Sequence, residues 1–258
     1  MTDKEGGAPL TEGVVGGSIT DGTNLWEITG ESATDGTIND FEVPIGSDHQ
    51  FSTWWWYRVA GDTAEHQMPF ADTEDYNGSL ATLTWSDVDG LGLFDATLNV
   101  FLIAQGPGGA LLSVLEISNI SGAPLPVDFF SYTDLDIDGT SASDSAVEAA
   151  PTQIDVTDVS TAFFLGNQAD AYRVDAFPNV RNALNDDAID DFASTGLPFG
   201  PGDFAGGYQW GRVVPTADSI IFETLTCINT LDQCPTFFVV FEDGFETGDT
   251  GVWDTTVP

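Results

Sequence analysis

Short apolar or alternating segments of strand length recur along the chain, between clusters of Gly, Pro, Asn, Asp and Ser, at a spacing of roughly ten residues. Regular spacing of this kind is typical of antiparallel sandwiches and barrels. We therefore predict an all-β protein, a large antiparallel β-sandwich. The predicted strands are 25–29, 38–43, 51–59, 81–85, 96–104, 111–117, 127–137, 153–156, 161–165, 172–177, 207–213, 219–225 and 237–241.

The composition is sufficient for a true core, because hydrophobic residues make up 41% of the chain and include 18 Phe and 7 Trp. Disordered acidic chains lack this aromatic content. One segment, 182–193, has apolar residues at helical spacing, and residues 196–198 (Gly-Leu-Pro) would end it, so we predict one short helix there. We expect a flexible leader at 1–20, a single β-sandwich domain at 21–241 and an acidic C-terminal tail at 242–258.

The charge restricts the possible partners. The chain has 42 Asp and Glu against 5 Lys and Arg, a formal net charge of −37. Phosphate binding depends on Lys and Arg, so this balance argues against nucleic acid, polyanionic substrates and anionic membrane surfaces. No apolar run is long enough to span a bilayer, and we predict no membrane insertion. Such a chain repels itself and needs counter-ions, salt or bound divalent cations.

The end of the chain carries a distinctive motif. Residues 241–258 contain Asp-Gly-Phe-Glu-Thr-Gly-Asp-Thr (243–250), followed by Trp253. The motif resembles a C-terminal tail of many exported bacterial proteins that are otherwise unrelated, although Thr247 replaces the usual Ser and Val252 stands where a small residue is common. The resemblance implies export and says nothing about activity. We therefore expect a secreted, extracellular protein whose signal peptide is absent from this sequence.

A second resemblance lies in the body of the chain. Residues 116–140 begin with Glu-Ile-Ser-Asn-Ile-Ser-Gly-Ala-Pro-Leu-Pro-Val and end with Tyr-Thr-Asp-Leu-Asp-Ile-Asp-Gly-Thr. They are similar to strand pairs of large extracellular β-sandwiches, the mutarotase-like supersandwiches among them. The resemblance implies a supersandwich-like fold and assigns no family.

The two cysteines, Cys227 and Cys234, are separated by residues 228–233, which suit a turn. This spacing permits a disulfide that closes a short loop, as in exported proteins. Two free thiols are the alternative. A zinc site is disfavoured because the chain has no second Cys pair and only 2 His.

The strongest local signal for a metal site is the run Asp-Leu-Asp-Ile-Asp-Gly-Thr at 134–140. In a strand Asp134, Asp136 and Asp138 would point to one face, where carboxylates without a basic partner favour a cation, most naturally calcium. The alternative is a solvated edge strand whose charge blocks aggregation. Asp87 and Asp89 form a second candidate calcium site, with an ordinary Asp-Gly turn as the alternative.

A row of aromatic residues provides the candidate ligand-binding surface. In a strand Trp54, Trp56 and Arg58 share one face, and Trp55 and Tyr57 share the other. One of the two sets should belong to the core, and an exposed second set would offer a platform for sugar rings. The alternative is a central strand buried on both faces, with Arg58 paired to a buried carboxylate.

Trp210 and Arg212 would form a plausible second wall of such a groove. His49 and His66 are each able to act as a general base, but a structural role is the simpler interpretation. The chain has no Gly-x-Ser-x-Gly motif and no cysteine in a catalytic context, so nucleophilic catalysis has little support.

Three functions remain open. The first is a secreted, acidic, calcium-stabilised β-sandwich module that binds a neutral glycan or a cell-surface component without catalysis. The second is a secreted hydrolase or isomerase that acts on neutral carbohydrate in a groove containing an aromatic residue, an Arg, a His and two carboxylates. The third is a self-associating subunit of an extracellular filament or coat, in which a terminal strand is exchanged.

Overall fold

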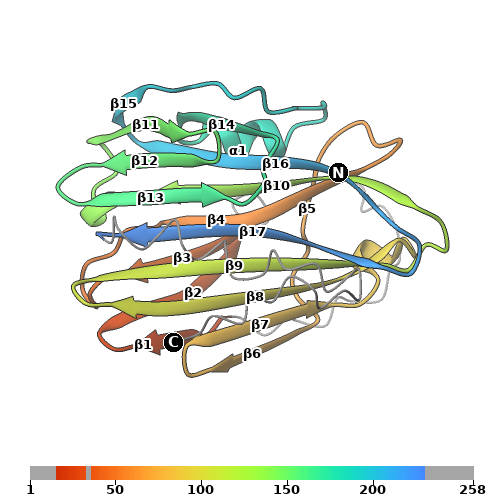
Figure 1. Cartoon of the computed structure of the whole chain (residues 1–258), viewed down its shortest axis with the longest axis horizontal. Coiled ribbons are helices and arrows are strands. Elements are labelled where there is room, and N and C mark those ends of the chain that lie inside the picture. Colours follow the sequence, from red (N-terminus) through yellow and green to blue (C-terminus); the bar gives the residue numbers. More distant parts are fainter. Residues whose placement is uncertain (1–15, 33–35, 230–258) are drawn as a thin grey trace, which may run out of the picture.

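Two antiparallel sheets face each other in the computed structural model, which describes residues 16–32 and 36–229 (Figure 1). The eight-stranded sheet has the order β1-β2-β3-β4-β10-β16-β14, and β5 also pairs with β4. Its strands are β1 (Ser18–Asp21), β2 (Asn24–Ser32), β3 (Gly36–Glu42), β4 (Ser52–Val59), β5 (His66–Gln67), β10 (Leu125–Leu135), β14 (Ala171–Ala176) and β16 (Phe204–Val214).

The nine-stranded sheet has the order β15-β11-β12-β13-β17-β9-β8-β7-β6. Its strands are β6 (Thr73–Asn77), β7 (Leu80–Trp85), β8 (Phe94–Gln105), β9 (Gly108–Asn119), β11 (Asp144–Ala150), β12 (Gln153–Thr157), β13 (Thr161–Gly166), β15 (Phe199–Gly202) and β17 (Ser219–Ile228). The predicted all-β, antiparallel sandwich is confirmed.

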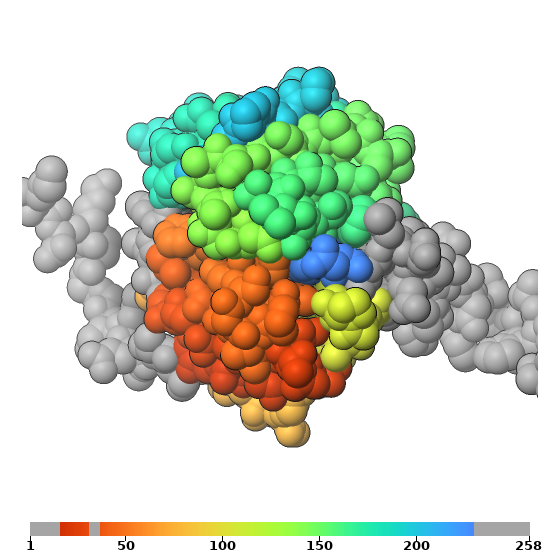
Figure 2. All heavy atoms as spheres, turned by 90° about the vertical axis from the view of Figure 1, so that its left-hand side faces the viewer, coloured from red at the N-terminus to blue at the C-terminus, as the bar shows by residue number. Residues whose placement is uncertain are grey.

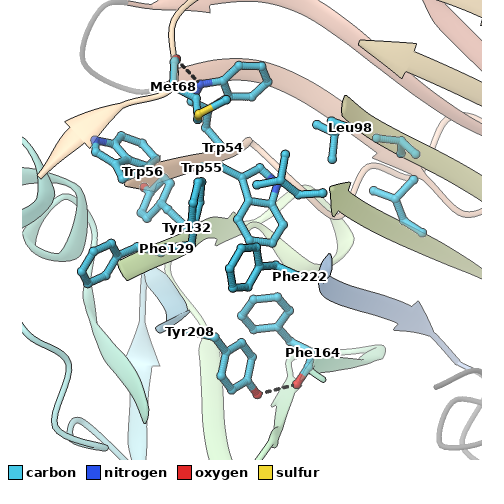
Figure 3. Close-up of a cluster of buried hydrophobic side chains, with 14 of the residues drawn as sticks. Trp54, Trp55, Trp56, Met68, Leu98, Phe129, Tyr132, Phe164, Tyr208 and Phe222 are labelled. Atoms are coloured by element: carbon cyan, nitrogen blue, oxygen red, sulfur yellow. Dashed lines mark hydrogen bonds between the residues drawn. The ribbon is translucent and has the colours of Figure 1, made fainter. Parts of the chain in front are cut away.

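The core lies between the sheets and is largely aromatic (Figure 3). The Phe129 and Phe222 ring centroids are 4.8 Å apart, and those of Phe164 and Tyr208 are 4.9 Å apart, so each pair joins one sheet to the other. Aromatic pairs at these separations stabilise the packing beyond simple burial. The strict alternation of buried and half-buried residues along most of β8 shows why the sequence there reads as a strand.

The outer face of the eight-stranded sheet is also covered. Helix α1 (Asn179–Leu184) contacts β14 and β16, and the Phe192 ring lies 5.4 Å from Phe130 of β10. Trp56 Nε1 donates a hydrogen bond to Asn185 Oδ1 at 3.1 Å. Strand β4 is therefore buried on both of its faces.

Two element boundaries in the structure differ from the predicted ones. The single α-helix in the described part of the chain begins at Asn179 and ends at Leu184, so it is shorter and earlier than the predicted 182–193. Residues 18–20, which we assigned to a leader, pair with β2 as part of β1. The rest of that leader through residue 15, the predicted strand 237–241 and the acidic tail 242–258 lie outside the described residues. None of the helices in the described ranges is long and apolar enough to cross a membrane.

Figure 2 shows one end of the sandwich. Residues from the N-terminal part of the chain, in red and orange, form the lower half, and the green segment that follows β10 lies in the upper half. The blue end of β17 emerges between the two halves, beside the yellow turn that joins β8 and β9. This is consistent with the pairing of Ile228 with Gly109.

Candidate metal centre

Three aspartates meet where β10 ends and β16 begins. Asp134 lies at the end of β10, Asp136 follows that strand, and Asp203 lies between β15 and β16. Leu135 of β10 pairs with Phe204 of the antiparallel strand β16. The residue after Leu135, Asp136, therefore lies close to the residue before Phe204, Asp203. One carboxylate oxygen of each aspartate lies within 4.8 Å of the others.

Several carboxylate oxygens in and beside this group lack a hydrogen bond of good geometry that would offset their burial. Asp134 is 2% exposed and its Oδ1 is unpartnered, as is Oδ1 of Asp136. Asp144, at the start of β11, is 0% exposed, and neither of its carboxylate oxygens makes a hydrogen bond of good geometry. The ion pairs of Arg58, Arg173 and Arg212 are made with other carboxylates. Buried charges without such compensation are unfavourable unless they are protonated or bind a cation.

The pKa values of these aspartates reflect the same unfavourable burial of negative charge. Burial, together with the neighbouring charges of Asp136, Asp203 and Asp144, raises the pKa of Asp134 to about 9. Burial likewise raises the pKa of Asp144 to about 7, although the nearby amides of Ile137 and Phe204 oppose the rise. The pKa of Asp136 rises to about 6 and that of Asp203 also rises, with burial as the main cause. The cluster therefore favours any ligand that supplies positive charge.

The chemistry of the site suits a hard divalent cation. The ligand atoms are all oxygens, which calcium and magnesium prefer, and the cluster includes no His or Cys. Two further buried oxygens without a hydrogen bond of good geometry, Ser52 Oγ and Tyr132 Oη, belong to the same region. Ser52 pairs with Asp134 across β4 and β10, and the charges of Asp134 and Asp136 influence the pKa of Tyr132. Neutral oxygens are therefore available beside the carboxylates.

The predicted arrangement of Asp134, Asp136 and Asp138 on one face of a strand is wrong. Strand β10 ends at Leu135, and Asp138 lies in the short 3-10 helix η2 (Ile137–Gly139) with φ 59°. Its carboxylate accepts hydrogen bonds from the backbone N–H of Ser160 at 2.6 Å and from the Ser160 hydroxyl at 2.8 Å. Asp134 and Asp136 remain in the cluster, and Asp203 takes the place expected for Asp138.

Asp87 and Asp89 lie in a turn and show no convergence on a metal. Both have positive φ, 51° and 56°, around the 3-10 helix η1 (Val88–Gly90). Asp87 Oδ1 accepts a hydrogen bond from the backbone N–H of Gly92, and Asp89 Oδ2 accepts one from the Tyr57 hydroxyl at 2.5 Å. These contacts are those of an ordinary Asp-Gly turn.

The tryptophan row is part of the core, so the prediction of an exposed platform is wrong. Trp54, Trp56 and Trp210 are 4%, 0% and 1% exposed. Trp210 Nε1 donates to the backbone oxygen of Asn167, and the Trp54 indole donates to that of Met68 (Figure 3). Sugar rings cannot stack on rings that are already covered by protein.

Arg58 and Arg212 line the same surface hollow. Both line a hollow of about 450 Å3 on the outer face of the eight-stranded sheet, together with the exposed side chains of Ile189 and Val213. Arg212 pairs with Asp170 at 2.6 Å. Arg58 forms ion pairs with three carboxylates, which confirms the expectation that it has a buried acidic partner.

The histidines have different environments. His49 is fully buried, its Nε2–H donates to the Val43 oxygen, and its Nδ1 accepts the Asp138 N–H. Burial lowers the pKa of His49, so this residue is a neutral structural histidine. His66 instead lines a second hollow, of about 530 Å3, with Glu65 and Asp89. Cys227 is buried, and Cys234 lies outside the described residues, so the disulfide stays a prediction.

The comparisons with known proteins identify a fold. No protein-family model matches the sequence, and no curated protein matches it. A bacterial glucoamylase complexed with acarbose is similar over 86% of this chain, with a TM-score of 0.57 and 10% identity. A putative aldose 1-epimerase from Escherichia coli K12 matches 82% of this chain and 98% of its own length, with a TM-score of 0.49 and 8% identity.

The chain spans 33% of the glucoamylase's length. The likeness to this protein shows that the two share a supersandwich-like β-sandwich fold, as the resemblance of residues 116–140 implied. At this level of identity it shows the fold alone.

Proposed function

We propose that this chain is a secreted, calcium-stabilised β-sandwich module that binds a neutral glycan or a cell-surface component without catalysing a reaction. The observation that carries the proposal is the group formed by Asp134, Asp136 and Asp203, with the buried carboxylate of Asp144 beside it. Calcium fits this group because it takes several oxygen ligands in irregular geometry, whereas magnesium requires a near-ideal octahedron. Calcium is also consistent with the expected extracellular location.

The proposed glycan surface is the hollow lined by Arg58, Ile189, Arg212 and Val213. Exposed apolar side chains beside guanidinium and carboxylate groups offer both the apolar contact and the hydrogen bonds that a neutral sugar needs. The similarity to a glucoamylase domain supports a carbohydrate ligand by analogy of fold.

Thermal unfolding after exhaustive chelation, followed by a calcium titration, tests the cation site. At calcium a hundredfold above its Kd, binding stabilises the fold by about 2.7 kcal/mol, which is roughly 5–10 °C in Tm for a domain of this size. Asp203→Asn should remove most of this rise, whereas Asp187→Asn, at an exposed position outside the cluster, should retain it. An equal rise with matched sodium chloride would show that the charge is only screened, and the proposal would fail.

Glycan binding has its own test. Calorimetric titration with neutral oligosaccharides should give binding by the calcium-loaded protein, and Arg212→Ala together with Val213→Ser should weaken it. If the double variant binds as well as the unchanged chain, the hollow is not the glycan site.

A second candidate function is hydrolysis or isomerisation of neutral carbohydrate. It is favoured by the hollow of about 530 Å3 that His66, Glu65 and Asp89 line. The Nε2 atom of His66 also lies 3.4 Å from Oδ2 of Asp62. A His beside carboxylates is suited to general acid–base chemistry. Turnover of a neutral sugar by the protein, lost in His66→Asn, would favour this function over the binding module.

A further inference from the structure

The outer face of the nine-stranded sheet carries an apolar patch that the proposed function does not use. We call the following residues the outer patch: Ala110, Phe163, Leu165, Leu225 and Cys227, with Ile103 and Leu112 packed against them. They alternate along their strands with inward-pointing residues such as Phe164 and Phe222, which contact the facing sheet. The patch therefore points away from the sandwich core.

The strand register makes the patch continuous. Phe163, Cys227, Ala110 and Ile103 are successive partners across β13, β17, β9 and β8. Leu165, Leu225 and Leu112 form a parallel row beside them. Four strands at about 4.8 Å spacing give the patch a width of about 14 Å.

The patch is covered, although it faces outward. Phe163 is 1% exposed, Leu165 is 6% exposed, and Leu225 and Cys227 are 0% exposed. Within residues 16–32 and 36–229, the main contacts of β13, β17 and β9 are with one another, with β12 and β8, and with β16 of the facing sheet. These elements bury the inner face, so the cover of the outer patch must come from another part of the chain or from a partner.

We propose that the outer patch is the docking surface for the chain's own C-terminal segment, residues 230–241. This segment contains the run Phe-Phe-Val-Val-Phe (237–241), whereas residues 1–15 contain no aromatic residue. The chain leaves β17 at Ile228, directly after Cys227 of the patch. The cover is therefore attached at the edge of the surface that it covers.

The length of the segment is sufficient. Phe237 lies eight positions after Asn229. At about 3.3 Å per residue this stretch of chain reaches about 26 Å, more than the width of the patch. The predicted disulfide would favour the same docking, because Cys227 belongs to the patch and would hold Cys234 against it. Cys234 lies three residues before the apolar run. The acidic residues that follow, 242–258, have no comparable apolar run and are expected to continue beyond the patch.

The thiol of Cys227 provides the test. In Cys234→Ser it is the single cysteine of the full chain, and its rate of reaction with a soluble disulfide reagent reports whether the patch is covered. Adding Phe237→Asp and Phe238→Asp, which alters both faces of an extended run, should accelerate the reaction by about tenfold or more, because Cys227 would no longer need local opening to react. Phe245→Asp with Trp253→Asp is the matched control and should leave the rate unchanged.

A second measurement does not depend on cysteine. Hydroxyl-radical labelling of Phe163 should increase in the Phe237→Asp, Phe238→Asp variant, while that of the inward-facing Phe164 should not. Equal Cys227 rates in this variant and in its control would overturn the proposal. The proposal would also be overturned if the Cys227 thiol reacted more slowly as the protein concentration was raised about fiftyfold. A second copy of the chain would then be the occupant of the patch.

Discussion

Replacement of Arg58 should reveal how strongly the fold depends on its few cations. Arg58 lies on β4 and is 9% exposed. Its Nη1 donates to Glu65 Oε1 at 2.6 Å, and its Nη2 donates to Asp128 Oδ2 at 2.8 Å and to Asp191 Oδ1 at 2.6 Å. The guanidinium also lies 5.5 Å from the centre of the Phe130 ring. One buried cation therefore compensates three carboxylates.

The exposed fractions of the three partner side chains determine how much stability Arg58→Met should lose. The Glu65 side chain is 0% exposed, so Arg58→Met would leave it as a buried charge without its cation, a change that costs about 3–5 kcal/mol. The Asp128 and Asp191 side chains are 30% and 62% exposed and can turn towards water, so each adds about 1 kcal/mol at most. We expect the free energy of unfolding to fall by about 3–7 kcal/mol, most of it from Glu65.

The loss should depend on pH. Burial raises the pKa of Glu65, and Arg58 is one of the groups that oppose the rise, so the pKa of Glu65 should rise further in Arg58→Met. A carboxyl whose folded-state pKa is raised contributes stability at low pH that is lost as the pH rises through that value. The destabilisation should therefore be smaller at pH 5 than at pH 8.

Urea unfolding followed by tryptophan fluorescence measures these differences. Glu65→Gln in the Arg58→Met chain removes the unpaired charge and should restore most of the lost stability. Arg212→Met is the matched control, because Arg212 and Asp170 are 31% and 54% exposed, and it should change the free energy of unfolding by less than about 1 kcal/mol. If Arg58→Met is as mild as the control, or Glu65→Gln brings no recovery, the reasoning about buried charge is wrong.

Two further results follow from the same structure. In chelator, the free energy of unfolding should fall as the pH rises from 5 to 8, because Asp134 and Asp144, with pKa values of about 9 and about 7, hold protons in the folded state that the unfolded state has released. Each such proton contributes about 1.4 kcal/mol per pH unit in urea titrations, and a flat profile would contradict the assignment. Gly207→Ala should lower the thermal midpoint followed by circular dichroism, because its Cβ would lie 2.0 Å from the Ser131 backbone oxygen of β10. An unchanged midpoint would show that β10 and β16 separate easily.

The fold class could be predicted from sequence because strands and tight turns leave local signals. The metal cluster could be predicted only in part. Asp134 and Asp136 are neighbours in the chain, but Asp203 and Asp144 reach them through the pairing of β10 with β16 and of β11 with β15. A shift of register would separate these residues, and no local pattern determines the register.

Two of the corrected expectations, the bounds of the helix and the exposed tryptophan row, have physical causes. The helix ends at Leu184, before Asp186 and Asp187, because negative charge is unfavourable at the C-terminal end of a helix dipole. The residues beyond it cover the outer face of β4, where Trp56 donates to Asn185. Periodicity assigns Trp54 and Trp56 to one face of a strand, but it cannot say whether a distant loop covers that face.

The position of the acidic cluster would give a bound cation a structural role between the two sheets. Asp134 belongs to β10 of the eight-stranded sheet, and Asp203 lies where the chain passes from β15 of the nine-stranded sheet to β16 of the other. The charge of Asp144, on β11 of the nine-stranded sheet, acts on Asp134 as well. A bound cation would therefore join both sheets at this end of the sandwich.

Removal of the cation should loosen that junction before the rest of the fold. On chelation, amide hydrogen exchange should accelerate in β11 and β15, while β7 and β8, which lie at the other side of the nine-stranded sheet, should keep their protection. Magnesium added in place of calcium should restore less protection, because the irregular set of aspartates does not supply an octahedron. Uniform acceleration across both sheets would instead mean that the cation only screens the net charge, and that the cluster does not clamp the sheets together.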